Sequence, residues 1–254
     1  MNSTTANSAL ATSVRHEQML KLVAKGFYKE LVAYGVEPTE VVTVAAHLLD
    51  NLMQKDSPAQ PGFDHYDHLF CIKDVQDDWI TKRRLAVEEV SLTPFHASLV
   101  PLVASWLRDP AVRGQFHPPF PESQAELRAY FEHPLRQYFV IFHGPQPAGL
   151  MGAENIDPAS RKLEMRKLVG EPSLRGKGVG KRATFLFLYL VFIIMRFNKV
   201  FIHSLDVNIR NLNLNRKFGF ELEGILWGEA IVGNQEQDVL RMALRVSTWK
   251  ALFS

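Results

Sequence analysis

A glycine-rich segment between a predicted strand and a long apolar helix constrains the fold of this chain more than any other feature. The segment spans residues 168–181 and reads LVGEPSLRGKGVGK. Alternating side chains predict a strand over residues 163–169, and the apolar run 185–195 predicts a buried helix that begins near residue 178. Three glycines between them let the backbone bend tightly and leave room for a ligand. These glycines are Gly176, Gly178 and Gly180.

The segment has the properties of an anion-binding site. The amides of such a loop and of the first helical turn have no partners inside the helix, so they can bind a negatively charged group. Arg175, Lys177, Lys181 and Arg182 add positive charge, which favours a diphosphate. The spacing excludes the dinucleotide-binding motif and the nucleotide P-loop, which need a third glycine further on and Gly-Lys-Ser/Thr, respectively. A plain glycine-rich turn is the alternative that the pattern leaves open.

Composition and periodicity divide the chain into four stretches. Residues 1–14 are rich in Ser, Thr and Ala and are expected to be a disordered start. Apolar residues at helical spacing, interrupted by a glycine and a proline, predict a helical hairpin module over residues 15–56. Residues 57–83 are expected to form a linker, because two prolines and a glycine lie near its beginning. Residues 84–254 are expected to form the main domain.

Strand-like and helix-like patterns alternate along the main domain. Strands are predicted over residues 85–92, 138–143, 148–156, 163–169, 200–205, 221–232 and 239–245. Helices are predicted over residues 94–108, 123–133, 178–197 and 211–218. No internal repeat is visible, so the prediction is a single βα-rich domain.

Composition excludes several classes of protein. Hydrophobic residues make up 46% and charged residues 22% of the chain, which excludes a fibrous or mostly disordered protein. The net charge of +2 argues against a nucleic-acid partner. The single cysteine, Cys71, and the absence of a secretory signal pattern favour a cytoplasmic location, and the run 185–195 is too short to span a membrane. His65 and His68 lack a third ligand, so no metal is expected.

Two blocks of the sequence resemble motifs of a known family, and they occur in the same order as in that family. Residues 175–180 (RGKGVG) resemble the acetyl-CoA signature of the GNAT superfamily, Arg/Gln-x-x-Gly-x-Gly/Ala. Asn208, then Gly219-Phe220, then Glu223-Gly224 resemble the family's Asn…Gly-Phe…Glu-Gly ending. The tail from Gly233 to Trp249 is similar to that of the ribosomal-protein N-terminal acetyltransferase branch.

The resemblance implies a mixed α/β (α+β) fold, in which a mixed sheet is splayed into a V and flanked by helices. Here an N-terminal helical extension would precede it. Acetyl-CoA, a cosubstrate, would lie in the V, with its pantetheine arm along Leu168, Val169 and Gly170 and with Asn208 on the other side. Its diphosphate would rest on the backbone of Arg175, Gly176, Lys177, Gly178, Val179, Gly180 and Lys181.

The family's chemistry is direct attack of an acceptor amine on the thioester. The amine must first lose a proton, often to a carboxylate. Glu164 shares one face of its strand with Arg166, and it is the predicted catalytic base. A salt bridge or a solvated strand position is the structural alternative for Glu164. Glu154 and His203 are further candidates, although a lone histidine in such a strand is commonly structural.

Asn215 departs from the family's pattern. Many relatives carry a tyrosine four residues before the Gly-Phe pair, where it protonates the leaving thiolate, and this chain has Asn215 there. An amide is not a useful proton donor. Either water or the ammonium product protonates the thiolate, or Asn215 merely orients the thioester. Loss of activity is the third alternative.

The expected function is that of an acetyl-CoA-dependent N-acetyltransferase that acts on a peptide α-amine or a small-molecule amine. A siderophore hydroxylamine is a second acceptor class, and an aminoglycoside is disfavoured because Arg166 would repel a polycation. The competing hypothesis is a non-catalytic acyl-CoA-binding or regulatory protein on the same fold. No nucleic-acid or membrane partner is expected, and a homodimer is one option.

Overall fold

The computed structural model divides into two compact units. One comprises Met1–Asp64 and Asp206–Asn213, and the other comprises His65–Leu205 and Leu214–Ser254. The structure describes residues 3–33, 36–37, 40–42, 44–45, 65–113, 119–205, 209–232 and 234–254.

The first unit contains one long helix, α1, which spans Ser3–Ala33. This differs from the disordered start expected over residues 1–14. The difference has a local cause, because that stretch contains several alanines, the residue with the highest helix propensity. Residues 40–42 and 44–45 are also helical, but most of the second half of the expected hairpin module, 15–56, lies outside the described residues.

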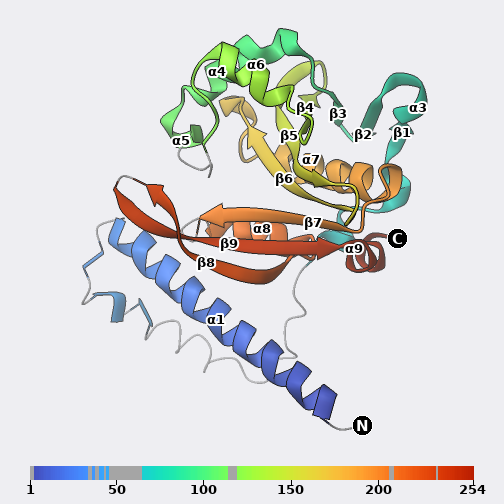
Figure 1. Cartoon of the computed structure of the whole chain (residues 1–254). Helices are drawn as coiled ribbons and strands as arrows, with labels where there is room; N and C mark the ends of the chain where they lie inside the picture. Colours follow the sequence, from blue (N-terminus) through green and yellow to red (C-terminus); the bar gives the residue numbers. More distant parts are fainter. Residues whose placement is uncertain are drawn as a thin grey trace. The chain divides into compact units, whose positions relative to one another are not determined.

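The second unit is built on a sheet of nine strands in the described part of the chain, in the order β1-β2-β3-β4-β5-β6-β7-β9-β8 (Figure 1). The strands are β1 (Gln76–Asp78), β2 (Arg84–Val87), β3 (Val90–Pro94), β4 (Gln137–His143), β5 (Gln146–Asp157), β6 (Lys162–Val169), β7 (Lys199–Leu205), β8 (Glu221–Val232) and β9 (Gln235–Arg245). Neighbouring strands are antiparallel except for β6 and β7, which are parallel.

The other elements are helices and short helical turns. The α-helices of the second unit are α3 (Trp79–Lys82), α4 (Val100–Leu107), α5 (Pro110–Arg113), α6 (Gln124–Phe131), α7 (Val179–Tyr189) and α9 (Val246–Phe253), and α8 (Ile209–Lys217) begins in the first unit and ends in the second. The 3-10 turns are η1 (Tyr66–His68), η2 (Ile72–Asp74), η3 (Ala97–Leu99) and η4 (Pro172–Leu174), and η5 (Leu190–Ile194) is a π-helical turn. The strand predicted over residues 85–92 is in fact the hairpin β2–β3, with Glu88 in its turn at a φ of 49°.

Residues 65–83, expected to belong to a linker, are instead folded onto the second unit. They contain η1, η2, β1 and α3, and β1 pairs with β2. Phe70 and Trp79 are buried, and the ring of Phe70 stacks on that of Phe185 with 4.7 Å between the centroids. These aromatic contacts anchor the segment, whereas the prolines and the glycine that indicated a linker all precede residue 65.

Phe70→Ala is expected to lower the free energy of unfolding by about 3–5 kcal/mol, because it deletes a buried ring in this core. The adjacent Leu69 is 42% exposed, so Leu69→Ala serves as the matched control and should cost about 0.5 kcal/mol or less. Urea unfolding followed by tryptophan fluorescence measures both. Equal effects of the two substitutions would mean that residues 65–83 are a linker after all.

The sheet splits between β6 and β7. The two strands pair only from Lys162–Glu164 to Lys199–Phe201 within the described residues. Beyond that point β6 continues along β5 to Val169, and β7 continues along β9 to Leu205. Figure 1 shows the two strands diverging from their paired ends. This is the V-shaped splay that the GNAT resemblance implied.

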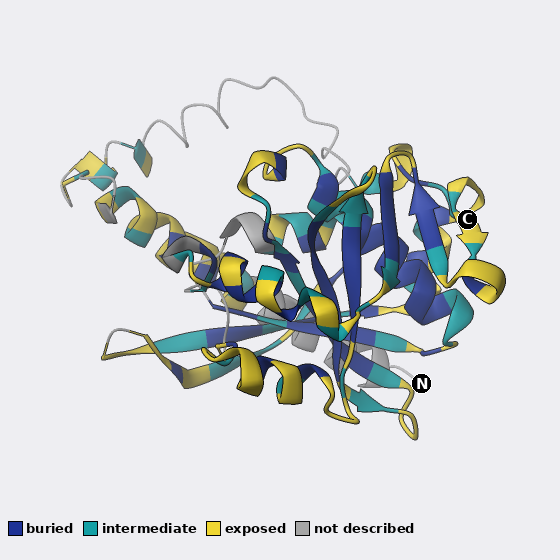
Figure 2. Cartoon of the chain, turned by 90° about the horizontal axis from the view of Figure 1, so that it is seen from above, coloured by how far each residue is buried: buried dark blue, intermediate teal, exposed yellow. Residues whose placement is uncertain are grey.

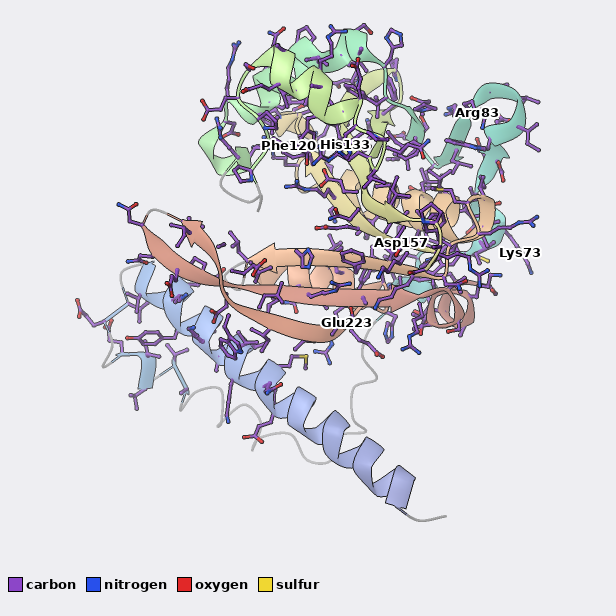
Figure 3. All side chains as sticks on the ribbon, viewed as in Figure 1. Lys73, Arg83, Phe120, His133, Asp157 and Glu223 are labelled. Atoms are coloured by element: carbon purple, nitrogen blue, oxygen red, sulfur yellow. The ribbon has the colours of Figure 1, made fainter. Side chains whose placement is uncertain are left out.

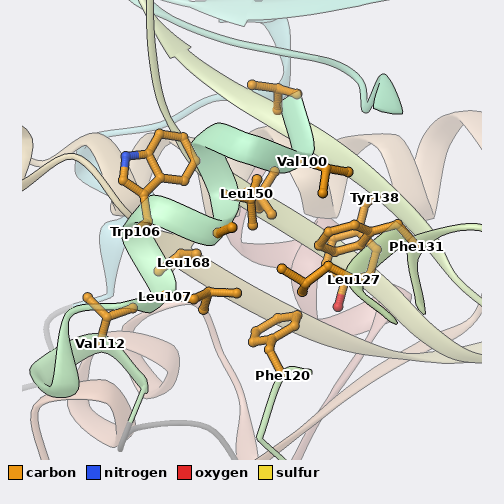
Figure 4. Close-up of a cluster of buried hydrophobic side chains, with 13 residues drawn as sticks. Val100, Trp106, Leu107, Val112, Phe120, Leu127, Phe131, Tyr138, Leu150 and Leu168 are labelled. Atoms are coloured by element: carbon orange, nitrogen blue, oxygen red, sulfur yellow. The ribbon is translucent and has the colours of Figure 1, made fainter. Parts of the chain in front are cut away.

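Each face of the sheet is covered by an apolar layer. On one face, side chains of β4, β5 and β6, including Tyr138, Leu150 and Leu168, pack against α4 and α6 in a single cluster (Figure 4). On the other face, Phe187 of α7 contacts Phe139 of β4, with 6.1 Å between the ring centroids. The central strands are accordingly buried over most of their length (Figure 2).

The apolar run 185–195 belongs to α7 and the π-helical turn η5 that follows it. Phe185, Leu186 and Phe187 are fully buried, and Trp249 and Phe253 of α9 pack against Phe185. Packing against the sheet and α9 therefore accounts for the hydrophobicity of this run. No helix in the described part of the chain is both long and apolar enough to cross a membrane.

Candidate active site

The loop from β6 to α7 lies beside the splay and has an unusual backbone. After Val169 the chain forms the turn η4, and Gly176 and Gly178 then adopt φ values of 80° and 79°. Residues with a side chain rarely adopt such φ values, so glycine is required at both positions. Gly178 is also the N-cap of α7 and supplies no side chain to bond the amides of the first turn.

The amides of this loop differ in whether they have a hydrogen-bond partner. Three of them bond to carbonyls within the loop: Arg175 to Pro172 at 3.2 Å, Lys177 to Leu174 at 3.4 Å and Lys181 to Gly178 at 3.1 Å. Four others make no hydrogen bond of normal geometry within the described part of the chain, namely those of Gly176, Gly178, Val179 and Gly180. Four consecutive or nearly consecutive donors at a helix N-terminus are suited to a phosphate group.

Arg175 holds the loop against the end of β6. Its Nε atom donates to the carbonyl of Val169 at 3.2 Å, and its Nη2 atom donates to the carbonyl of Gly170 at 3.0 Å. Its Nη1 atom lies 3.0 Å from Oδ2 of Asp109. The side chain of Arg175 is therefore engaged with the protein itself, and the same is true of Arg182, whose Nε atom donates to Glu88 at 2.7 Å.

The remaining positive charge near the loop comes from three lysines. Lys177 is exposed, and the Nζ atom of Lys181 lies 4.9 Å from the ring centroid of Tyr66. Lys167, which the sequence analysis did not single out, donates from Nζ to Oγ1 of Thr184 at 3.2 Å, and Thr184 in turn donates to the carbonyl of Gly180. Burial lowers the pKa of Lys167 to about 8, and a nearby anion would oppose that shift.

The end of β6 can offer only its backbone to a ligand. Leu168 packs its side chain into the apolar cluster of Figure 4, and a Cβ atom on Gly170 would lie 2.1 Å from the ring of Trp106. The amide of Gly170 donates to Ala148 of β5, so the backbone of Val169 turns toward the side that β7 has left. This edge, together with the four amides, fits an extended arm that ends in a diphosphate.

Glu164 lies at the point where the strands separate, and its carboxylate is fully engaged. Its partner in the last register pair with β7 is Phe201. Its Oε2 atom accepts from Nδ2 of Asn155 at 2.7 Å, and its Oε1 atom lies 3.0 Å from Nδ1 of His203. Burial by itself would raise the pKa of Glu164, but His203, Asn155 and the charge of Arg166 together hold it below the ordinary value.

Glu154, the second candidate base, faces Glu164 across the β5–β6 pair but belongs to a separate buried network. Its Oε1 atom accepts from the hydroxyls of Tyr130 and Tyr138. Arg166 donates from Nη1 to Tyr130 at 2.9 Å and lies 3.5 Å from Oε2 of Glu154. Burial raises the pKa of Tyr130 to about 12 against the charge of Arg166, so its phenol stays protonated and keeps donating.

Arg166 therefore pairs with Glu154 rather than with Glu164. Both side chains of the pair are 6% exposed, and the guanidinium carbon of Arg166 also lies 4.6 Å from the ring centroid of Phe120. Figure 3 labels Phe120 and Glu223, which lie on the two sides of the strand divergence. The salt bridge weighed for Glu164 and Arg166 is thus replaced by two distinct polar groups on one face of the sheet.

Two further predicted site residues, Asn208 and Asn215, come later in the sequence than the residues of β5 and β6 described above. Asn215 is buried in α8, and its backbone carbonyl accepts from the amides of Phe218 and Phe220 at 2.9 and 3.2 Å. Asn208 lies outside the described residues. Among the described residues, no group of three or more His, Cys, Asp or Glu side chains could hold a metal ion.

The splayed sheet, with a glycine loop at the helix N-terminus beside the split, defines the acetyltransferase (GNAT) domain. The model of that family matches residues 89–221, just over half of the chain, and the chain belongs to this family. GNAT acetyltransferases use acetyl-CoA as the acetyl donor.

Several of the similar proteins are named as spermidine N-acetyltransferases. The chain is 27% identical to the spermidine N(1)-acetyltransferase of Escherichia coli K12 over 106 residues, which is 42% of this chain and 56% of that protein. The chain thus spans about half the length of the curated relatives it matches. Among solved structures, the spermidine N-acetyltransferase of Vibrio cholerae in complex with CoA and spermine has a TM-score of 0.60 and 21% identity, covering 63% of this chain and 98% of that one.

A dodecameric structure of the same Vibrio cholerae enzyme has a TM-score of 0.56 and 22% identity over 63% of this chain and 96% of that chain. At these identities the solved structures show the shared fold. None of these relatives belongs by name to the ribosomal-protein N-terminal acetyltransferase branch, so that finer resemblance remains a prediction.

Proposed function

We propose that this protein transfers the acetyl group of acetyl-CoA to an amine that lies in the splay between β6 and β7. The observation that carries the proposal is a set of four amides between Gly176 and Gly180, at the N-terminus of α7, that form no hydrogen bond with any described residue. A diphosphate satisfies such donors and is stabilised by the positive end of the helix. Lys167, Lys177 and Lys181 supply positive charge around it.

The cofactor positions follow from the same geometry. The diphosphate would rest on the backbone between Gly176 and Gly180, and the pantetheine arm would run along the edge of β6 that β7 has left. When bound, acetyl-CoA supplies an acetyl group activated as a thioester. The predicted contact from Asn208 and the orienting role of Asn215 remain parts of this proposal.

The acceptor is proposed to be an amine, and the structure changes the argument about its charge. Arg166 was expected to repel polycations, but its charge is buried and paired with Glu154. Polyamines are therefore included, beside peptide α-amines and other small-molecule amines, among the acceptors that we propose to test, and the names of the relatives support this choice. Cytoplasmic location and self-association stay in the proposal, the first because Cys71 is unpaired and the second because a relative is dodecameric.

Two measurements on the full chain test this function. Calorimetric titration with coenzyme A is expected to show one site per chain, and thiol release from acetyl-CoA is expected with at least one amine of a panel. The panel contains spermidine, peptides with free N-termini, a hydroxylamine and an aminoglycoside. Binding without turnover on the whole panel would favour the non-catalytic acyl-CoA-binding alternative, and absence of binding would overturn both.

A further inference from the structure

His203 of β7 has one ring nitrogen in a hydrogen bond and the other without a partner. Its Nδ1 atom lies 3.0 Å from Oε1 of Glu164. Its Nε2 atom is buried and has no hydrogen-bond partner within the described part of the chain. A buried polar atom without a partner destabilises the fold, so one that persists in a native structure commonly has a functional reason.

The carboxylate of Glu164 determines which nitrogen of His203 carries the hydrogen. Because the pKa of Glu164 lies below its ordinary value, the group is ionised near neutral pH and can only accept hydrogen bonds. Nδ1 of His203 is then the donor, and in the tautomer that this hydrogen bond selects, Nε2 carries the lone pair. Asn155 holds the second oxygen of Glu164, which fixes the orientation of the carboxylate.

The pair stands where an acceptor amine has to meet the thioester under the proposed function. Glu164 and Phe201 form the last register pair between β6 and β7, and His203 follows two residues later on the same face of β7. The side chain is 21% exposed, although its Nε2 atom is itself buried. The imidazole is therefore located just inside the point where the strands separate.

The other candidate bases are less suited to take a proton. Both oxygens of Glu164 are engaged with Asn155 and His203, and both oxygens of Glu154 lie in the network with Tyr130, Tyr138 and Arg166. A carboxylate with a lowered pKa is also a poor general base near neutral pH.

We infer that His203 is the general base that deprotonates the acceptor amine and that Glu164 is its positioning residue. This inference rests on the proposed function. In the step, Nε2 of His203 takes a proton from the ammonium group, and the amine lone pair forms the C–N bond with the acetyl carbonyl carbon. The C–S bond breaks and the sulfur leaves as the thiol with the second proton of the nitrogen. His203 returns the first proton to water, so one proton is released for each acetyl group transferred.

The charged groups that face His203 are few in the described part of the chain. Glu164 contacts the ring, and Arg166 lies further along the same face of β6. Arg241 is the register partner of His203 on β9, and its Nε atom donates to Glu223 of β8 at 2.9 Å. Arg241 also lies over the ring of Phe201, with 4.0 Å from its guanidinium carbon to the ring centroid. These ion pairs leave Glu164 as the charge in direct contact with the imidazole.

His203→Gln is expected to lower kcat for the accepted amine by at least about 100-fold near pH 7, as is usual for loss of a general base. The affinity for coenzyme A should stay within about 2-fold. The matched control is His143→Gln, because His143 on β4 also pairs with a glutamate, Glu89, at 3.0 Å, but away from the splay. The control should keep kcat within about 2-fold.

Two further readouts separate a base from a structural residue. The loss in His203→Gln should shrink as the pH rises to about 9.5, or when fluorine beside the amino group makes the acceptor neutral near pH 7, because such an amine needs no base. In the free wild-type protein, nitrogen-15 NMR of histidine should show His203 with its hydrogen on Nδ1, and Glu164→Gln should disturb that tautomer.

The outcomes distinguish this inference from the proposed function. An active wild-type enzyme whose His203→Gln variant keeps more than about a third of kcat, or loses it equally with neutral and charged amines, contradicts the role of His203. A hydrogen on Nε2 in the free protein contradicts it as well. A wild-type protein that binds coenzyme A but releases no thiol with any amine instead contradicts the proposed function.

Discussion

Gly178→Glu is expected to raise the Kd for coenzyme A by at least about 100-fold. Gly178 lies at the N-terminus of α7 between two of the unbonded amides, so a carboxylate there would compete for those donors and repel the diphosphate. Loss of two hydrogen bonds to a charged group, each worth about 1.5–3 kcal/mol, is enough for an effect of this size. Calorimetric titration measures it directly.

The control for this substitution is Gly144→Glu in the turn between β4 and β5. Gly144 has a φ of 55°, and nothing lies within 4 Å of a Cβ atom placed on it. The control therefore introduces the same charge and a similar backbone strain away from the loop, and it should bind coenzyme A like the wild type. Equal affinities for the two variants would mean that the loop does not hold the diphosphate.

Glu154→Ala is expected to lower the free energy of unfolding by about 3–5 kcal/mol. The substitution leaves the charge of Arg166 buried without its carboxylate and removes the acceptor of the Tyr130 and Tyr138 hydroxyls. Removing one partner of a buried ion pair destabilises the folded state because the remaining buried charge then has no opposite charge beside it. Urea unfolding at neutral pH measures the change.

The matched control for Glu154 is Glu122→Ala. Glu122 also pairs with an arginine, Arg113, but its side chain is 78% exposed. A surface pair of this kind contributes about 1 kcal/mol or less. If the two substitutions destabilise the protein equally, the network around Glu154 is not a buried structural unit.

Local signals allowed the glycine-rich loop between β6 and α7 to be predicted from the sequence. Glycines at 176, 178 and 180 lie between a strand pattern and an apolar helix pattern, so the loop can be recognised from neighbouring residues alone. Two of these glycines do adopt positive φ values. The splay of the sheet followed from the family resemblance, and the register of β6 and β7 confirms it. Residues 65–83 were mistaken for linker because their aromatic anchors contact residues more than a hundred positions away, such as Phe185.

The polar contacts of the site could not be predicted in the same way. Alternation along a strand put Glu164 and Arg166 on one face, and a salt bridge there was one structural alternative to a catalytic role of Glu164. The structure instead pairs each with a residue of another strand, Glu164 with His203 and Arg166 with Glu154. Such partners depend on strand order and register, which a single sequence does not contain.

A crystal structure of the complex with coenzyme A shows whether the loop between β6 and α7 holds the diphosphate. Diphosphate oxygens are expected within about 2.7–3.2 Å of the amide nitrogens of Gly176, Gly178, Val179 and Gly180. A coenzyme bound elsewhere, with those four amides still lacking an acceptor, would contradict this expectation.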